Sequence, residues 1–170
     1  MKWIQKISNY IKIHVFGFCE PRHKEDKVFY NDKNQYHRDD GPAIEYSNGN
    51  KYWYQQGQLH REDGPAVEYA DGTKIWYQHD KRHREDGPAV EYANGTKHWY
   101  RNGNLHREDG PAVEYPNGYK FWFRHDLIHR EDGPAIESSN GDKEWWLSNK
   151  KIDVKSQEEF ERYIKLKAFW

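Results

Sequence analysis

Residues 63–85 read DGPAVEYADGTKIWYQHDKRHRE, and close copies of this stretch fill most of the chain. The tetrapeptide Asp-Gly-Pro-Ala opens each copy and recurs every 23 residues, at 40–43, 63–66, 86–89, 109–112 and 132–135. We number these copies units 1 to 5. Eight of their positions are identical: Asp, Gly, Pro, Ala, Glu, Gly, Lys and Trp. Self-similarity at a fixed period of this size indicates a repeat architecture, in which each unit contacts its neighbours.

Each unit predicts two short strands joined by tight turns. In unit 2, residues 66–69 and 73–77 are rich in strand formers and flank an Asp-Gly pair. Unit 4 carries Pro116 before Asn117 and Gly118, which favours a three-residue loop with a bulge over a two-residue turn. That register places the invariant Glu opposite Lys and the invariant Ala opposite Trp. We therefore expect an all-β fold, an antiparallel β-hairpin solenoid or meander of about five units.

The two ends of the chain differ from the repeats. Residues 2–12 place apolar side chains on one stripe of a helix, and Ser156 to Glu159 form a capping box that opens a second helix over 156–168. This predicts an N-terminal cap of helix plus strand at 1–27, a repeat array at 28–151 and a C-terminal capping helix at 152–170. Each helix would cover a sheet edge. Contact of residues 2–12 with a membrane surface is the alternative.

The composition excludes several classes of protein. Aromatic residues make up 16% of the chain, which argues against disorder and predicts an aromatic core. The formal net charge is -1, with the signs interleaved, so the chain lacks the basic footprint of a nucleic-acid-binding protein. Cys19 is the only cysteine, which excludes an intrachain disulfide and favours the cytoplasm. The apolar stretch at 3–18 is too short and too polar to span a bilayer.

The period, the glycine-containing turns and the aromatic pairs over residues 28–151 resemble MORN-type repeats, in the divergent form found in bacteria, phages and large DNA viruses. MORN units usually begin with Tyr-x-Gly, whereas these lead with His-Arg-Glu-Asp-Gly-Pro-Ala. The resemblance implies an elongated hairpin ribbon that serves as a scaffold or contact surface. It implies no catalytic residues, and a viral chain would act in the cytoplasm of its host.

The repeated polar residues have structural explanations. A row of histidines recurs in phase: His37, His60, His83, His106 and His129. Equivalent residues lie two strands apart, roughly 9–10 Å, which is too far to share one metal ion. We expect the His, Arg and Asp side chains to hold the corners by hydrogen bonds, and each invariant Glu to be paired with a Lys. The invariant Trp row is interpreted as a packing spine. We therefore expect no enzyme activity, metal or cofactor.

The variable positions predict the function. The register puts them on one face of the sheet, together with a row of tyrosines, and this mixture is favoured at protein contact sites. We expect a partner protein to dock on this face. Its predicted contact residues are Tyr52, Tyr69, Ile75, Tyr92, His98, Tyr115 and Phe121.

Two alternatives remain open on the sequence. The same face could instead be a buried core layer, because packing also favours aromatic residues. The chain could also sequester a nucleotide or another small anion, which would require a pocket lined by Arg61, Arg84 and Arg107.

Overall fold

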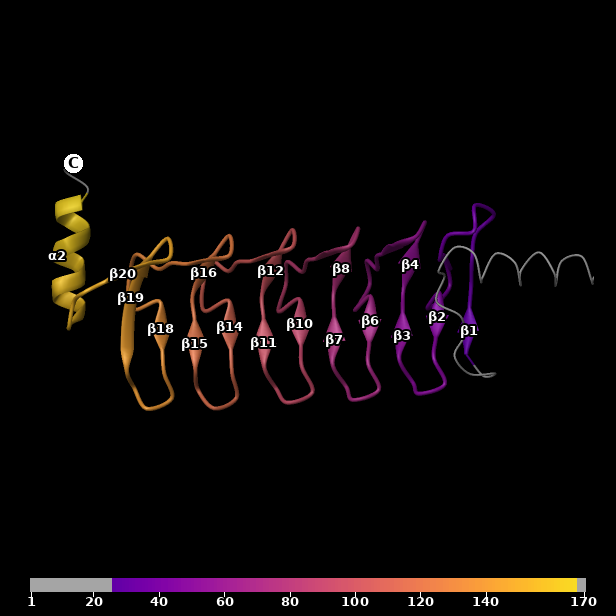
Figure 1. Cartoon of the computed structure of the whole chain (residues 1–170), viewed down its shortest axis with the longest axis horizontal. Coiled ribbons are helices and arrows are strands. Elements are labelled where there is room, and N and C mark those ends of the chain that lie inside the picture. The colour runs from indigo at the N-terminus through magenta and orange to yellow at the C-terminus, as the bar shows by residue number, and fades with distance from the viewer. Residues whose placement is uncertain (1–25, 168–170) are drawn as a thin grey trace, which may run out of the picture.

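The structure is a computed structural model that describes residues 26–167. The helix predicted at 2–12, and most of the predicted N-terminal cap, lie outside the described residues. The described chain forms a long antiparallel β-sheet followed by one helix, α2 (Gln157–Lys167) (Figure 1). The prediction of an all-β hairpin meander with a C-terminal helix is confirmed.

The main sheet is a single twelve-stranded layer that begins with β1; units 1 to 4 then contribute two strands each and unit 5 contributes three. In Figure 1 the strands follow one another along the long axis of the molecule, with the hairpin turns along one edge. Their order in the sheet is β1 (Lys27–Val28), β2 (Ile44–Glu45), β3 (Lys51–Tyr52), β6 (Val67–Glu68), β7 (Lys74–Ile75), β10 (Val90–Glu91), β11 (Lys97–His98), β14 (Val113–Glu114), β15 (Lys120–Phe121), β18 (Ile136–Glu137), β19 (Lys143–Leu147) and β20 (Lys150–Ile152).

The predicted register of the hairpins is confirmed. In unit 2 the Tyr69 amide donates to the Thr73 carbonyl at 2.9 Å, which closes a three-residue loop, and Glu68 lies opposite Lys74. Lys74 also lies opposite Glu91 of the next unit. The same Glu–Lys pairing therefore joins strands within a unit and strands of neighbouring units.

The second strand of units 1 to 4 is shorter than predicted, whereas in unit 5 it runs unbroken as β19. The predicted strand 73–77 breaks at Trp76, whose amide donates to the Ala89 carbonyl of the next unit at 2.8 Å, while its carbonyl accepts from the His83 amide at 3.1 Å. Both backbone groups are thus used at the point where the chain leaves the main sheet. It then forms a small two-stranded ribbon, so the prediction of only two strands per unit is wrong. The ribbons are β4 (Tyr54–Gln55) with β5 (Gln58–Leu59), β8 (Tyr77–Gln78) with β9 (Lys81–Arg82), β12 (Tyr100–Arg101) with β13 (Asn104–Leu105), and β16 (Phe123–Arg124) with β17 (Leu127–Ile128).

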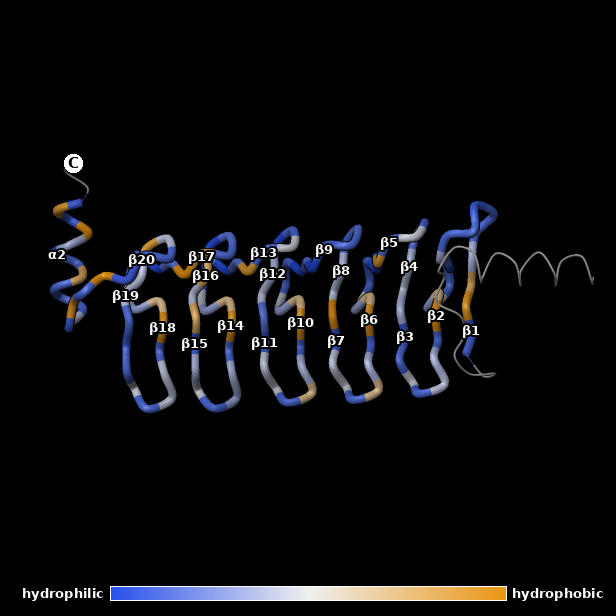
Figure 2. Tube along the Cα trace, viewed as in Figure 1, coloured by the Kyte–Doolittle hydropathy of each residue, from blue (hydrophilic) through white to orange (hydrophobic). Residues whose placement is uncertain are grey.

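Apart from Trp145 and Phe160 at the C-terminal end, the buried hydrophobic residues are aliphatic and mostly small, so the prediction of an aromatic core is wrong for the repeats. The five invariant alanines, at 43, 66, 89, 112 and 135, are fully buried, and Val67 and Val90 are nearly so. Figure 2 shows the matching pattern, with hydrophobic segments in the middle of the sheet and hydrophilic turns. Of the predicted Trp spine only Trp145 is buried. The other four lie half-buried at the surface, because an arginine of the following corner stacks on each ring.

Helix α2 packs against the last strands of the array. Ser156 caps it, with its hydroxyl accepting a hydrogen bond from the Glu159 amide at 3.2 Å. The Phe160 side chain is fully buried against Trp145, Leu147 and Ile152. Across residues 26–167, no helix combines the length and the apolar character that crossing a bilayer requires.

The ribbon turns provide a test of how the units are joined. Asp126 has a positive φ of 62°, and its carboxylate accepts a hydrogen bond from the Leu105 amide of the preceding unit at 2.7 Å. We expect Asp126→Ala to lower the free energy of unfolding by about 1–2 kcal/mol, because it strains the turn and removes this bond. Chemical denaturation of purified variants measures the change. Asp126→Gly should cost less, as glycine relieves the strain and stands at the equivalent position in units 1 and 3; equal losses would contradict this account.

Candidate interaction surface

The main sheet has two chemically different faces. We call one the aromatic face; it carries three rows of side chains that run along the array. The rows are Tyr46, Tyr69, Tyr92 and Tyr115 near the turns; Tyr52, Ile75, His98 and Phe121 in the middle; and Tyr54, Tyr77, Tyr100 and Phe123 where the ribbons begin. We call the other the charged face; it carries the invariant Glu, Lys, Trp and Arg.

Rings on the aromatic face contact one another edge to face along the array. Tyr92 and His98 have ring centroids 5.1 Å apart, His98 and Tyr115 6.4 Å, and Tyr115 and Phe121 6.0 Å. The same geometry joins Tyr52 to Tyr69 at 6.0 Å. Such pairs contribute beyond the area that they bury, so the rings support one another without a second layer.

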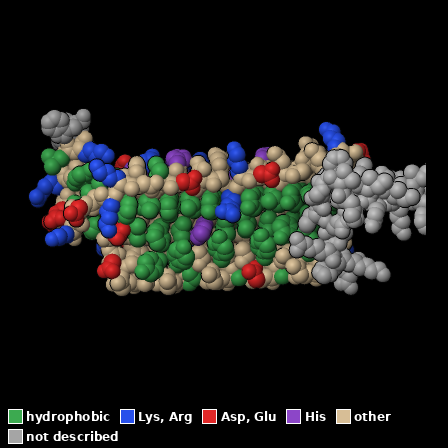
Figure 3. All heavy atoms as spheres, viewed as in Figure 1, with side chains coloured by type: hydrophobic (Ala, Val, Ile, Leu, Met, Phe, Trp, Pro, Cys, Tyr) green, Lys and Arg blue, Asp and Glu red, His purple; other side chains and the backbone are tan. Residues whose placement is uncertain are grey.

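No other described element covers this face. The described strands form one layer in Figure 1, and α2 packs at the end of the array. Figure 3 shows a broad hydrophobic band along the middle of the sheet, with few charged side chains within it. Tyr92 is 38% and Tyr115 is 42% exposed. The face is therefore built as a packed surface, yet it remains open to solvent in the described chain.

All seven residues predicted as contacts lie on this face, but they are not equally accessible. Tyr92 and Tyr115 protrude, whereas Tyr52, Tyr69 and His98 are half-buried. Phe121 is likewise half-buried. Ile75 is only 8% exposed and packs with Val67 and Val90 beneath the tyrosines, so it supports the surface more than it forms it.

Two titratable groups of the face are held in their neutral forms. Burial, followed by the neighbouring Tyr69, raises the pKa of Tyr52 to about 12. Burial, followed by the positive charge of Arg82, lowers the pKa of His98 below its usual value. Neither ring nitrogen of His98 has a hydrogen-bond partner among the described residues. The side chains of Tyr52 and His98 are therefore uncharged at neutral pH.

The buried position of His98 predicts a pH dependence of stability. Its pKa is lower in the folded than in the unfolded chain, so the unfolded chain binds more protons below the unfolded pKa of about 6.5. The stability that neutral His98 contributes is therefore present above that pH and is lost as the pH falls toward the folded pKa. We expect His98→Phe, which copies Phe121, to lose less stability than the unsubstituted chain between pH 7.5 and pH 5. Urea denaturation at each pH measures this, and identical pH slopes would contradict it.

Arg82 is a feature of this face that sequence reasoning missed. It stands where units 1, 3 and 4 have Leu59, Leu105 and Ile128 and unit 5 has Lys151. The Arg82 guanidinium contacts the hydroxyls of Tyr77 at 3.4 Å and Tyr100 at 3.2 Å. Within residues 26–167 no carboxylate forms an ion pair with it. The sequence does show this difference, because at this position of the repeat Arg82 replaces the aliphatic residue of units 1, 3 and 4.

The charged face is organised around the invariant arginines. Arg107 lies 4.2 Å from the Trp99 ring centroid, and bonds Asp109 at 2.9 Å, Glu114 at 3.0 Å and the Pro111 carbonyl at 3.3 Å. Arg107 beside Asp109 lowers the pKa of that carboxyl. The invariant Glu lies opposite Lys in the sheet as predicted, but its carboxylate is bonded mainly by the arginine of the corner.

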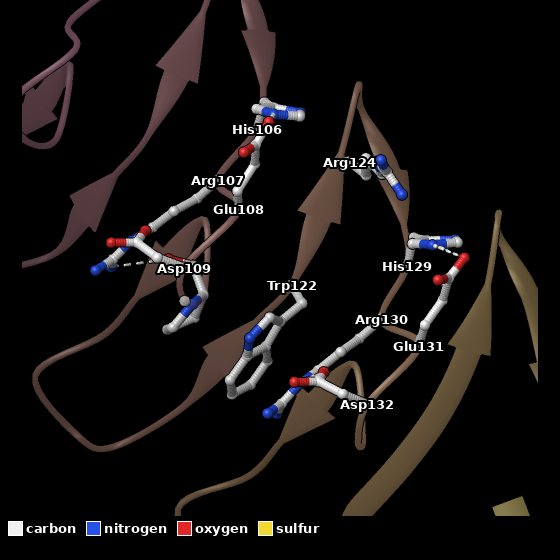
Figure 4. A pocket seen from close by; sticks show the side chains of 12 residues that line it. His106, Arg107, Glu108, Asp109, Trp122, Arg124, His129, Arg130, Glu131 and Asp132 are labelled. Atoms are coloured by element: carbon white, nitrogen blue, oxygen red, sulfur yellow. Dashed lines mark hydrogen bonds and ion pairs between the residues drawn. The ribbon is translucent and has the colours of Figure 1, made fainter. Parts of the chain in front are cut away.

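A groove of about 640 Å³ separates successive corners on this side of the molecule. In Figure 4 Trp122 lies between the two corners, with Arg107 extended alongside Asp109 and Arg130 alongside Asp132. An equivalent groove lies one unit earlier. Because each groove repeats the joint between two units, we interpret it as a consequence of the frame.

The arginines of the anion-binding alternative do not gather in one pocket. Arg61, Arg84 and Arg107 occupy successive corners, and each bonds its own Asp and Glu. Arg84 and Arg107 line one groove together with four carboxylates. Their charges are already neutralised, which disfavours an anion there.

Four of the five histidines in the row accept a hydrogen bond from a backbone amide in the ribbon turn of the next unit, whereas neither ring nitrogen of His106 has a hydrogen-bond partner among the described residues. The His83 Nδ1 accepts a hydrogen bond from the Asn102 amide of the next unit at 3.1 Å, and His129 accepts one from the Ser148 amide at 3.2 Å. Over residues 26–167, no three His, Asp or Glu side chains gather as a metal site would require.

Comparison with known proteins does not assign the chain to a family. No protein-family model matches the chain, and a search of curated proteins finds no matching relative.

Proposed function

We propose that this chain is a non-enzymatic repeat module that binds a protein partner through the aromatic face. The observation that carries the proposal is the continuous apolar band on one side of a single-layer sheet (Figure 3). Monomeric proteins rarely expose contiguous apolar patches larger than a few hundred Å². A face of this size and chemistry therefore favours a partner.

The residues of the face suit a protein more than a small molecule. Tyrosine, phenylalanine and arginine are enriched at protein interfaces, and Lys and Glu are depleted. The ring contacts hold the tyrosines in place before binding, which lowers the entropy lost on association. The resemblance to MORN-type repeats belongs to the same proposal, with a scaffold or contact role in the cytoplasm, of a host cell if the chain is viral.

Substitutions on the two faces test this function. Tyr92→Lys with Tyr115→Lys adds two positive charges to exposed positions of the aromatic face. Glu62→Gln with Glu85→Gln changes the net charge equally, at exposed positions near the corners. Partners captured from the producing cell are identified, purified and titrated against each folded variant.

We expect one purified protein to bind the unsubstituted chain and the Glu62/Glu85 variant alike, and the Tyr92/Tyr115 variant at least tenfold more weakly. Equal binding to all three, or the absence of any protein that binds after purification, would overturn the proposal. Circular dichroism and thermal unfolding establish that each variant is folded.

A further inference from the structure

A pocket of about 370 Å³ lies where the ribbons of units 3 and 4 adjoin. Its basic side chains are Arg101, His106, Arg124 and His125, and its acidic side chain is Glu108. None of the invariant corner arginines lines it, so it is distinct from the grooves between the corners.

The two arginines of this pocket are specific to units 3 and 4. At the same position of the repeat, units 1 and 2 carry Gln55 and Gln78, and unit 5 carries Leu147. Arg101 and Arg124 are both exposed, so neither holds the frame together as the corner arginines do. The frame accepts glutamine at this position, and the arginines place two cations on adjacent ribbons.

Positive charge exceeds negative charge in this pocket. Within residues 26–167 no carboxylate forms an ion pair with Arg124. Arg101 pairs with Glu108 at 3.7 Å, and the Glu108 side chain is 76% exposed, so this contact is long and open to solvent. By contrast, the corner Arg107 bonds two carboxylates, at 2.9 and 3.0 Å. Two guanidiniums of the pocket therefore share one loosely held carboxylate.

The paired histidine rings of this pocket lack hydrogen bonds that an equivalent pair makes. The ring centroids of His106 and His125 lie 4.4 Å apart, and those of His60 and His79 lie 4.3 Å apart. The His60 Nδ1 accepts a hydrogen bond from the His79 amide at 3.4 Å, and the His79 ring bonds Gln58 at 3.2 Å. Within residues 26–167 neither bond has a counterpart at His106 and His125. The polar atoms that units 1 and 2 satisfy internally are thus left for another partner.

The side chain of Asn104 accounts for part of this difference. It stands where unit 1 has a glutamine, and it is one methylene shorter, so it does not reach the His125 ring. The His106 side chain is only 4% exposed, and its Nε2 lies 3.6 Å from Glu108. A buried ring without a hydrogen bond, an exposed histidine and two arginines therefore border one space.

The spacing of the arginines fits one tetrahedral oxyanion. Arg101 and Arg124 are one repeat apart, which is about 9–10 Å between their backbones. A phosphate with a bidentate guanidinium on either side separates the two guanidinium carbons by about 8 Å. The pocket is larger than a phosphate requires and lies within the range of about 300–1,000 Å³ of small-molecule sites. The amide of Asn104, which also lines it, can bond a polar group attached to the phosphate.

We infer that this pocket binds a phosphate monoester of a small polar molecule, with Arg101 and Arg124 on either side of the phosphate and His125 donating to it. Glu108 turns outward into solvent when the anion binds. Arg101 follows Tyr100 in β12, and side chains alternate along a strand, so the pocket and the aromatic face lie on opposite sides of the ribbon. The inference therefore goes beyond the proposed function, and either can fail without the other.

An NMR titration of the ¹⁵N-labelled full chain at pH 7.5 and constant ionic strength tests the inference. We expect glycerol 3-phosphate to shift the amide signals of residues 101–104 and 124–125 saturably, and to bind at least threefold more tightly than inorganic phosphate. Arg101→Gln with Arg124→Gln, which copies units 1 and 2, should weaken binding at least tenfold. Lys33→Gln with Lys155→Gln removes the same charge at exposed positions outside the pocket and should leave binding unchanged.

The carboxylate of the pocket provides an opposite test. Glu108→Gln removes the negative charge beside the anion and should tighten binding at least threefold, whereas Glu62→Gln, at the same position of unit 1, should have no effect. Circular dichroism establishes that each variant is folded.

The absence of saturable shifts up to 50 mM glycerol 3-phosphate would overturn the inference. Equal weakening by the arginine pair and the lysine pair, or equal effects of Glu108→Gln and Glu62→Gln, would overturn it as well, because binding would then follow the net charge of the chain. Inorganic phosphate that binds as tightly as the ester would overturn the monoester as the ligand in favour of the free anion.

Discussion

Phe160→Ala is expected to lower the free energy of unfolding by about 3–5 kcal/mol, the usual cost of removing a buried phenylalanine ring. The ring is fully buried, and its centroid lies 6.4 Å from that of Trp145. Phe160 is the buried residue of α2 and packs the helix onto the last strands. Because repeat arrays depend on their terminal units, the loss should reach the whole array. Guanidinium denaturation followed by tryptophan fluorescence measures it.

Leu166→Ala is the matched control for this prediction, because Leu166 lies on the same helix but is 59% exposed. It should change the stability by less than about 0.5 kcal/mol. Similar losses from both substitutions would mean that α2 contributes through its helical propensity and not through the Phe160 contact.

Arg84→Ala is expected to cost about 2–3 kcal/mol, because several interactions of a half-buried guanidinium are lost together. Arg84 lies 4.1 Å from the Trp76 ring centroid and bonds Asp86 at 2.8 Å, Glu91 at 3.0 Å and the Pro88 carbonyl at 3.3 Å. It thus joins unit 2 to unit 3. Urea denaturation of the purified variant, followed by circular dichroism, measures the loss.

Two substitutions separate geometry from charge at this corner. Arg84→Lys keeps the charge but cannot make the planar stack and the paired bonds, so we expect it to recover less than half of the loss. Arg101→Ala removes an arginine whose side chain is 54% exposed, and should cost less than about 0.5 kcal/mol. Full rescue by lysine would show that only the charge at this position matters.

The hairpins could be predicted because their turn residues restrict the backbone strongly. Pro116 and Gly118 leave few conformations for the loop, and the invariant Glu and Lys then identified the register. The break at Trp76 was not predictable in the same way. It depends on hydrogen bonds to Ala89 in the next unit and His83 in the same unit, and strand propensity continues unchanged through Tyr77.

The role of the tryptophans could not be inferred from the repeat alone. A row of invariant Trp residues is compatible with burial and with stacking at a surface. Only the path of the chain brings Arg84 over Trp76. For the aromatic face, the register predicted which residues share it, but alternation along a strand does not show whether a second layer covers them.

Glu68 pairs with Lys74 inside unit 2, and Lys74 pairs with Glu91 of unit 3 in the same antiparallel manner. The strand pairing of the main sheet is therefore the same within a unit and between units. A gene that gains or loses 23 codons in frame would leave every remaining strand with neighbours of the same kind. The length of the molecule can therefore evolve in steps of ~9–10 Å without a new fold. Each such step would add or remove one unit's side chains from the rows of the aromatic face.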